Sequence, residues 1–158
     1  MPKARAMAAM SRDQAPSSLD FHAGPKELPS SPQQLPLSGK SVLVIEDEML
    51  IAMCVEACLG DAGVAMVRIA NSLVLARRIL DEGIRFDAAI VDLYMPDGNA
   101  SPLVQLLSAR GVPVVITTGD PAGHAEPALT TAAAILQKPR SNGDLIKAVI
   151  GCMVGASH

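Results

Sequence analysis

The segment DAAIVDLYMP, residues 87–96, constrains the fold of this chain more than any other. Four consecutive apolar residues, 88–91, precede Asp92, and turn formers begin at Pro96. A short apolar run that ends at turn formers predicts a strand buried on both faces. Asp92 would then lie at the carboxyl end of a parallel strand, the edge where open α/β sheets bind ligands. The alternative is an ordinary cap or turn aspartate, and the other strand ends decide between the two.

Similar apolar runs recur along the chain and alternate with helical patterns. Ser72 is expected to cap the second helix, and Gly60 and Gly63 are expected to stop the first. Five strands alternating with five helices predict an α/β fold, a flavodoxin-like (βα)5 doubly wound parallel sheet of strand order 2-1-3-4-5. We expect strands at 41–45, 64–70, 88–91, 113–117 and 132–136, and helices at 49–59, 73–82, 101–110, within 120–131 and at 145–154.

One folded domain is expected over residues 40–154, with a short C-terminal end at 155–158. Residues 1–39 are rich in Pro, Ser, Gln and Ala and lack apolar periodicity, which predicts a flexible tail. The residues after 154 are too few for a further domain, so the domain is expected to stand alone.

Composition argues against several classes of function. The net charge is −3 and aromatic residues make up 2% of the chain, so neither an electrostatic footprint nor stacking platforms for nucleic acid are expected. No apolar run approaches the roughly 20 residues that span a bilayer, so no membrane partner is expected. Three cysteines without a CxxC pair argue against a disulfide framework or zinc site and favour a cytoplasmic protein.

Polar residues follow four of the predicted strands at the same edge of the sheet. Glu46 and Asp47 follow the first strand, Asp92 the third, Thr118 the fourth and Lys138 the fifth. Carboxylates that meet without other ligand types favour a hard cation, Mg²⁺. A lysine and a hydroxyl beside them suit an anion with equatorial oxygens, as in phosphoryl transfer. Asp92 is then the nucleophile, which would form an aspartyl phosphate.

The motifs IEDE (45–48), VDLYMP (91–96), ITTG (116–119) and LQKP (136–139) resemble those of response-regulator receiver domains, in order, over residues 40–154. The resemblance implies that Lys138 pairs with the phosphoryl oxygens, that Thr118 is the switch hydroxyl, and that a cis peptide precedes Pro139. It also implies a magnesium site with Asp47 as a direct ligand, Glu46 acting through water, Asp92 as ligand and phosphoacceptor, and Tyr94 contributing its backbone carbonyl.

Three positions depart from the family pattern. Glu46 stands where aspartate is commoner. Ala100 replaces a glycine, so its backbone must avoid positive φ. Ile135 occupies the place of the Tyr or Phe that rotates inward on activation, so phosphorylation would be read through Thr118 and the segment that follows it.

The implied function is a stand-alone response regulator rather than an enzyme. It would take a phosphoryl group from a histidine kinase or histidine phosphotransferase and signal by protein contact or phosphorelay to an unknown downstream protein. Two alternatives stay open. One is a pseudo-receiver that binds partners without phosphorylation. The other is an aspartate-nucleophile phosphatase, which needs a second acid two residues beyond its nucleophile after the first strand.

The helices within 48–60 and 142–154 are apolar nearly all round, which predicts an interface with Met53 and Met153 on its exposed side. The resemblance implies that this interface is the kinase-docking surface, and a homodimer interface is the alternative. Other polar residues are given modest roles. His124 is expected to be an exposed loop residue, Asp97 a turn residue, and Cys54 and Cys58 buried small hydrophobes. Asp120 and Tyr94 are candidates to influence the lifetime of the aspartyl phosphate.

Overall fold

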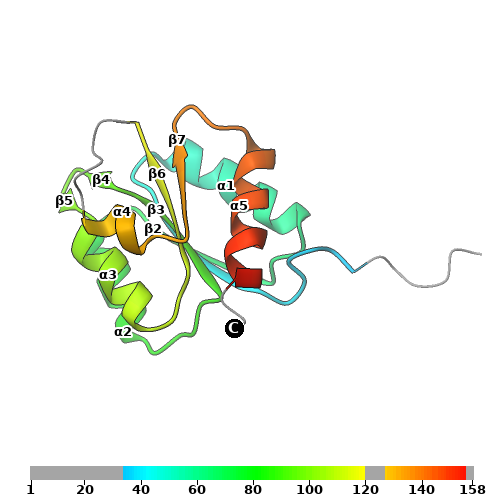
Figure 1. Ribbon diagram of the computed structural model, residues 1–158, viewed down its shortest axis with the longest axis horizontal. Coiled ribbons are helices and arrows are strands. Elements are labelled where there is room, and N and C mark those ends of the chain that lie inside the picture. Colours follow the sequence, from blue (N-terminus) through cyan, green and yellow to red (C-terminus); the bar gives the residue numbers. More distant parts are fainter. Residues whose placement is uncertain (1–33, 120–126, 156–158) are drawn as a thin grey trace, which may run out of the picture. The chain divides into compact units, whose positions relative to one another are not determined.

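The computed structural model describes residues 34–119 and 127–155, so residues 1–33 of the tail predicted at 1–39, together with Asp120 and His124, lie outside the described part. Along the chain the elements are β1 (Ser41–Ile45), α1 (Met49–Asp61), β2 (Met66–Ala70), α2 (Leu73–Asp81), β3 (Ala88–Asp92), β4 (Tyr94–Met95), β5 (Gly98–Asn99), α3 (Ser101–Ala109), β6 (Val114–Thr118), α4 (Pro127–Thr131), β7 (Ala134–Gln137) and α5 (Asn142–Gly155) (Figure 1). Within these residues, no helix is long and apolar enough to cross a bilayer.

The main sheet has five parallel strands in the order β2-β1-β3-β6-β7. Counted along the sheet strands alone, this is the predicted order 2-1-3-4-5, so the flavodoxin-like fold is confirmed. The predicted bounds were too wide at β2, which begins at Met66, and at β7, which begins at Ala134. β6 runs one residue further than predicted and includes Thr118.

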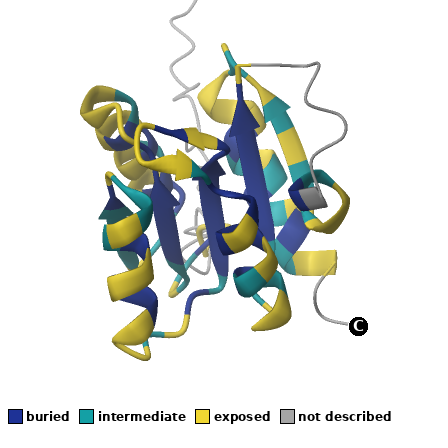
Figure 2. Cartoon of the chain, turned by 90° about the vertical axis from the view of Figure 1, so that its left-hand side faces the viewer, coloured by how far each residue is buried: buried dark blue, intermediate teal, exposed yellow. Residues whose placement is uncertain are grey.

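Alternation along the strands divides the interior into two cores, one on each face of the sheet. One face of β1, β3 and β6 packs on α2, α3 and α4, and the other packs on α1 and α5. Figure 1 shows these two groups of helices on either side of the sheet. Figure 2 shows the central strands fully buried while each helix exposes its outer side. Burial on both faces explains why the strands read as continuous apolar runs.

Local sequence explains where the helices begin and end. α1 passes through Gly60, contrary to expectation, and ends at Asp61; Ala62 is its C-cap, and Gly63, whose φ is +96°, follows the cap. The bonds Gly63 N–H to Gly60 O (2.9 Å) and Val64 N–H to Leu59 O (3.0 Å) form a Schellman motif, which requires the left-handed residue at Gly63. The predicted cap of α2 is confirmed, because Ser72 Oγ accepts the Leu75 N–H at 3.2 Å.

A small antiparallel hairpin of β4 and β5 follows β3 and was not predicted, because two-residue strands carry no periodicity. It leads into Ala100, which is fully buried with φ −79°, so the predicted avoidance of positive φ is confirmed. The cis peptide between Lys138 and Pro139 is confirmed as well.

Candidate functional site

The register of the parallel sheet brings the predicted residues to one edge. Asp92 at the end of β3 pairs with Thr117 of β6, and Thr118 pairs with Gln137, the residue before Lys138. Glu46 directly follows β1 and stays bonded to the sheet, since its N–H donates to Ala70 O at 3.0 Å. Residues from four strand ends therefore meet although they are far apart in sequence.

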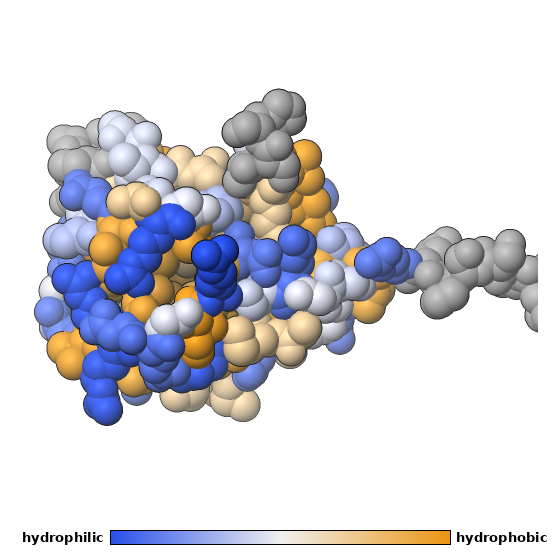
Figure 3. Space-filling model, turned by 90° about the horizontal axis from the view of Figure 1, so that it is seen from below, coloured by the Kyte–Doolittle hydropathy of each residue, from blue (hydrophilic) through white to orange (hydrophobic). Residues whose placement is uncertain are grey.

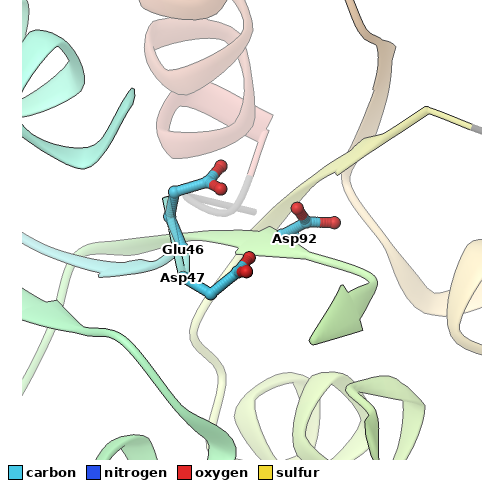
Figure 4. A group of neighbouring side chains, drawn as sticks. All are labelled: Glu46, Asp47 and Asp92. Atoms are coloured by element: carbon cyan, nitrogen blue, oxygen red, sulfur yellow. The ribbon is translucent and has the colours of Figure 1, made fainter. Parts of the chain in front are cut away.

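Three carboxylates converge at this edge, from Glu46, Asp47 and Asp92 (Figure 4). Each offers an oxygen within 4.8 Å of the others. Glu46 is 4% exposed and Asp92 9%, whereas Asp47 lies at the surface. The cluster is therefore buried at Glu46 and Asp92 and open to solvent at Asp47.

Lys138 joins two of the three acids. Its Nζ lies 2.8 Å from Glu46 Oε2 and 2.7 Å from Asp92 Oδ2. Burial alone would lower the pKa of Lys138, but hydrogen bonds and charge from Asp92 and Glu46 outweigh it and raise the pKa above the ordinary lysine value. Lys138 is therefore a cation at neutral pH, in contact with the phosphoacceptor candidate.

Backbone groups fix the remaining orientation. The Tyr94 N–H donates to Asp92 Oδ1 at 3.2 Å, and the Lys138 N–H donates to Thr118 O at 2.8 Å. Thr118 itself is 4% exposed at the end of β6, while Tyr94 is 44% exposed. The two oxygens of Asp92 thus face different partners, the backbone on one side and Lys138 on the other.

The donor set of this cluster fits a magnesium ion. All three residues offer carboxylate oxygens, the ligands that hard divalent cations prefer. Three carboxylates and the single ammonium of Lys138 leave two formal negative charges at close range, which a divalent cation neutralises. The chemistry of the donors therefore agrees with the cofactor that the sequence motifs imply.

Arg140 is a residue of this edge that sequence reasoning missed. Burial, partly offset by the charges of Glu46, Cys58 and Asp92, lowers the pKa of its guanidinium, and its buried Nε has no partner among the described residues. Its position two residues after Lys138, in the loop that follows β7, was the available signal.

A groove of about 530 Å³ runs beside Lys138, between α1 and the loop before α5. Cys54 borders it and is exposed, so the expectation that this residue is a buried hydrophobe was wrong, and Cys58 is only partly buried. The residues lining the groove are mostly apolar and include two basic side chains: Leu50, Ile51, Cys54, Val55, Lys138, Pro139, Arg140 and Asn142.

The exposed apolar residues are concentrated on one of the two helices predicted to form an interface. On α1, Leu50 is 73% exposed, Met53 55% and Met49 51%. On α5, Met153 is only partly buried rather than exposed and packs against the core shared with α1, so its expected place on the outer side was wrong. The uncovered surface therefore belongs mainly to the first turns of α1.

The opposite edge of the sheet carries none of the predicted site residues. A cavity of about 490 Å³ lies there, lined by Leu80, residues 83–87 and residues 110–112. Figure 3 views the molecule from below and shows hydrophilic and hydrophobic residues interspersed on that face. The chemically distinctive cluster is thus confined to the carboxyl ends of the strands.

Comparison with known proteins gives one family and many similar structures. The model of the family described as response regulator receiver domain matches residues 42–150. A response regulator receiver protein from Sinorhizobium medicae is 22% identical with TM-score 0.68, covering 77% of this chain and 99% of its own. A receiver domain protein from Clostridium thermocellum is 26% identical with TM-score 0.66, covering 73% and 95%. TrrA of Thermotoga maritima, solved in complex with Mg²⁺ and BeF, is 18% identical with TM-score 0.63, covering 70% and 96%. No curated protein matches.

Proposed function

Since the chain belongs to the family of response regulator receiver domains, we propose that Asp92 accepts a phosphoryl group from a histidine kinase or histidine phosphotransferase. The observation that carries this proposal is the contact of Lys138 Nζ with Asp92 Oδ2 at 2.7 Å, inside a cluster of three carboxylates. The phosphorylated protein would signal by contact with a downstream protein or by relay, as a signalling domain rather than an enzyme. A similar receiver, TrrA, was solved with Mg²⁺ and BeF.

In the proposed transfer, an oxygen of Asp92 attacks the phosphorus of the donor phosphohistidine. The P–N bond breaks and its electron pair stays on the imidazole nitrogen, which leaves with the donor. Lys138 already contacts Asp92, and its ammonium group would pair with a phosphoryl oxygen once the carboxylate of Asp92 loses its charge. The hydroxyl of Thr118 would donate a hydrogen bond to a second phosphoryl oxygen, which would link the phosphoryl group to β6.

Glu46, Asp47, Asp92 and the carbonyl of Tyr94 would hold the magnesium ion. Bound there, Mg²⁺ would supply positive charge that offsets the negative charge of the carboxylates and of the incoming phosphoryl group. The protein's own contribution is to hold these oxygens in place through Lys138 and through the N–H of Tyr94.

The groove beside α1 is the proposed docking surface for the phosphodonor. Its wall contains Lys138, so a helix seated in the groove carries its histidine next to Asp92. The exposed Leu50 and Met53 suit an apolar stripe, and Arg140 suits an acidic residue on the donor. The alternative is that a second copy of the chain covers this surface, in a homodimer through residues 48–60 and 142–154.

A labelling experiment tests the proposal. With Mg²⁺ and acetyl phosphate, the protein should gain one acid-stable, hydroxylamine-labile phosphoryl group. Asp92→Asn should abolish the labelling. Asp87→Asn is the matched control, because Asp87 is a carboxylate paired with Lys40 before β3, at the other end of that strand. Labelling that survives the Asp92→Asn substitution or an excess of chelator contradicts the proposal and favours a pseudo-receiver that works by binding alone.

A further inference from the structure

The hairpin of β4 and β5 is in direct contact with the phosphoacceptor candidate. Its first residue, Tyr94, donates its N–H to Asp92 Oδ1 at 3.2 Å. The base of the hairpin is closed by Ala100 N–H to Leu93 O at 2.9 Å, and Met95 is buried in the core. The position of Asp92 Oδ1 therefore depends on where the hairpin sits.

Asp97, at the turn of this hairpin, reaches across to the start of α2. Its Oδ1 accepts the Leu73 N–H at 3.1 Å and its Oδ2 accepts the Val74 N–H at 3.2 Å. The hydrogen bond from the Leu73 N–H lowers the pKa of Asp97 below its ordinary value. Desolvation opposes this shift, and the hydrogen bond from the Val74 N–H adds to it. A negative carboxylate thus satisfies two free N–H groups at a helix N-terminus.

The helix has a cap of its own, so Asp97 does more than supply a missing one. Ser72 is the N-cap and satisfies the Leu75 N–H from within the helix. Asp97 instead comes from a segment more than twenty residues away and ties that segment to α2. Gly98, with φ +141°, provides the backbone conformation that follows Asp97 in the turn.

We propose that Asp97 is a positioning residue for the phosphorylation site, holding the hairpin so that Tyr94 presents its backbone to Asp92 and to the metal. This inference rests on the proposed function, because it assigns the hairpin a part in the same magnesium site. The connection is continuous: α2 binds Asp97, Asp97 fixes the turn, and the turn carries Tyr94, which binds Asp92. Such coupling is reciprocal, so metal binding should also tighten the start of α2.

Two substitutions separate this role from simple stabilisation of the helix. Asp97→Ala removes the link between hairpin and α2, whereas Ser72→Ala removes a cap of the same helix and leaves the hairpin untouched. Tyr94 is the single tyrosine in a chain without tryptophan, so a change in its fluorescence on Mg²⁺ addition should report binding at the site. Asp97→Ala should raise the Mg²⁺ concentration at half-saturation about fivefold, the low end of couplings between sites. Ser72→Ala should leave it within about twofold, and Asp97→Asn should fall between, since one carbonyl oxygen remains.

Amide exchange gives a second readout that does not depend on phosphorylation. Adding Mg²⁺ to the wild-type protein should slow exchange of the Leu73 and Val74 amides, and Asp97→Ala should remove this response. If the Mg²⁺ concentration at half-saturation is the same in the wild-type, Asp97→Ala and Ser72→Ala proteins, the inference is overturned and the proposed function is unaffected. A wild-type protein with neither a Mg²⁺ response nor labelling of Asp92 overturns both.

Discussion

Lys138 Nζ and Asp92 Oδ2 lie 2.7 Å apart although 46 residues separate them in the sequence. The side chain of Asp92 is 12% exposed and that of Lys138 23%, so water screens this pair only partly. Lys138 also pairs with Glu46, and without it the three carboxylates would face one another uncompensated. The same lysine therefore supports both the folded state and the proposed chemistry.

Lys138→Met should destabilise the protein at neutral pH. Breaking a fully buried ion pair costs roughly 3–5 kcal/mol, and the partial exposure of Lys138 reduces the expected loss to about 1–3 kcal/mol. Urea unfolding measures it. Lys40→Met is the control, because the Lys40–Asp87 pair is 44% and 36% exposed and should contribute about 1 kcal/mol or less. Magnesium should restore more stability to Lys138→Met than to the wild type, and equal losses in the two variants would contradict this account.

The raised pKa of Lys138 gives this contribution a definite pH dependence. The folded protein holds the Lys138 proton more tightly than the unfolded chain, whose lysine pKa is 10.5. The stabilisation is therefore complete below that pH and is lost as the pH rises through the higher pKa of the folded state. The difference in unfolding free energy between wild type and Lys138→Met should accordingly shrink above pH 10.5.

Thr118→Ala should separate phosphorylation from its structural response. Thr118 is the last residue of β6, and its carbonyl accepts the Lys138 N–H. Ile135 has no hydroxyl that could replace the hydroxyl of Thr118. Labelling of Asp92 should persist, while the change in amide exchange over residues 119–131 on adding beryllofluoride should disappear. Thr118→Ser keeps the hydroxyl and should keep the response. If the alanine variant responds like wild type, the hydroxyl is not the switch.

The sequence predicted the fold because the evidence was repeated along the chain. Every sheet strand except β2, which Arg68 interrupts, contains a continuous apolar run, and Glu46, Asp92, Thr118 and Lys138 all follow such runs. Parallel strands end at one edge, so the meeting of these residues follows from topology alone.

Three features needed coordinates. The two bonds from Asp97 to α2 join segments more than twenty residues apart, and the β4–β5 hairpin is too short to show a period. The exposure of Cys54 could not be read from spacing, because α1 is apolar on the side that faces the groove as well as on the side that faces the sheet. Apolar character alone therefore does not say which side of a helix is buried.

The three cysteines should react with a thiol reagent in the order of their exposure. Cys54 is exposed and should be modified first, followed by the partly buried Cys58. Burial raises the pKa of the Cys152 thiol, which reduces its thiolate fraction, so Cys152 should stay unmodified until the protein unfolds. Mass spectrometry of peptides after limited alkylation measures the order, and Cys54→Ser should remove the fastest phase. Early modification of Cys152 would show that α5 does not pack on the sheet as described.

The uncovered apolar residues of α1 lead to the last prediction. A charge in an apolar contact opposes binding, so Leu50→Glu and Met53→Glu should each slow phosphotransfer from the cognate donor by about tenfold or more, equivalent to about 1.4 kcal/mol. Both side chains are more than half exposed in the isolated protein, so unfolding free energies should change little. Val74→Glu is the matched control, since Val74 is 67% exposed but lies on α2, across the sheet from the groove. Labelling by acetyl phosphate, which needs no docking surface, should be equal in all the variants.

Sedimentation tests whether a second copy of the chain covers the same surface. A wild-type dimer that becomes monomeric in Leu50→Glu would assign the surface to that second copy. Unchanged transfer and unchanged association in folded variants would mean that this surface binds neither.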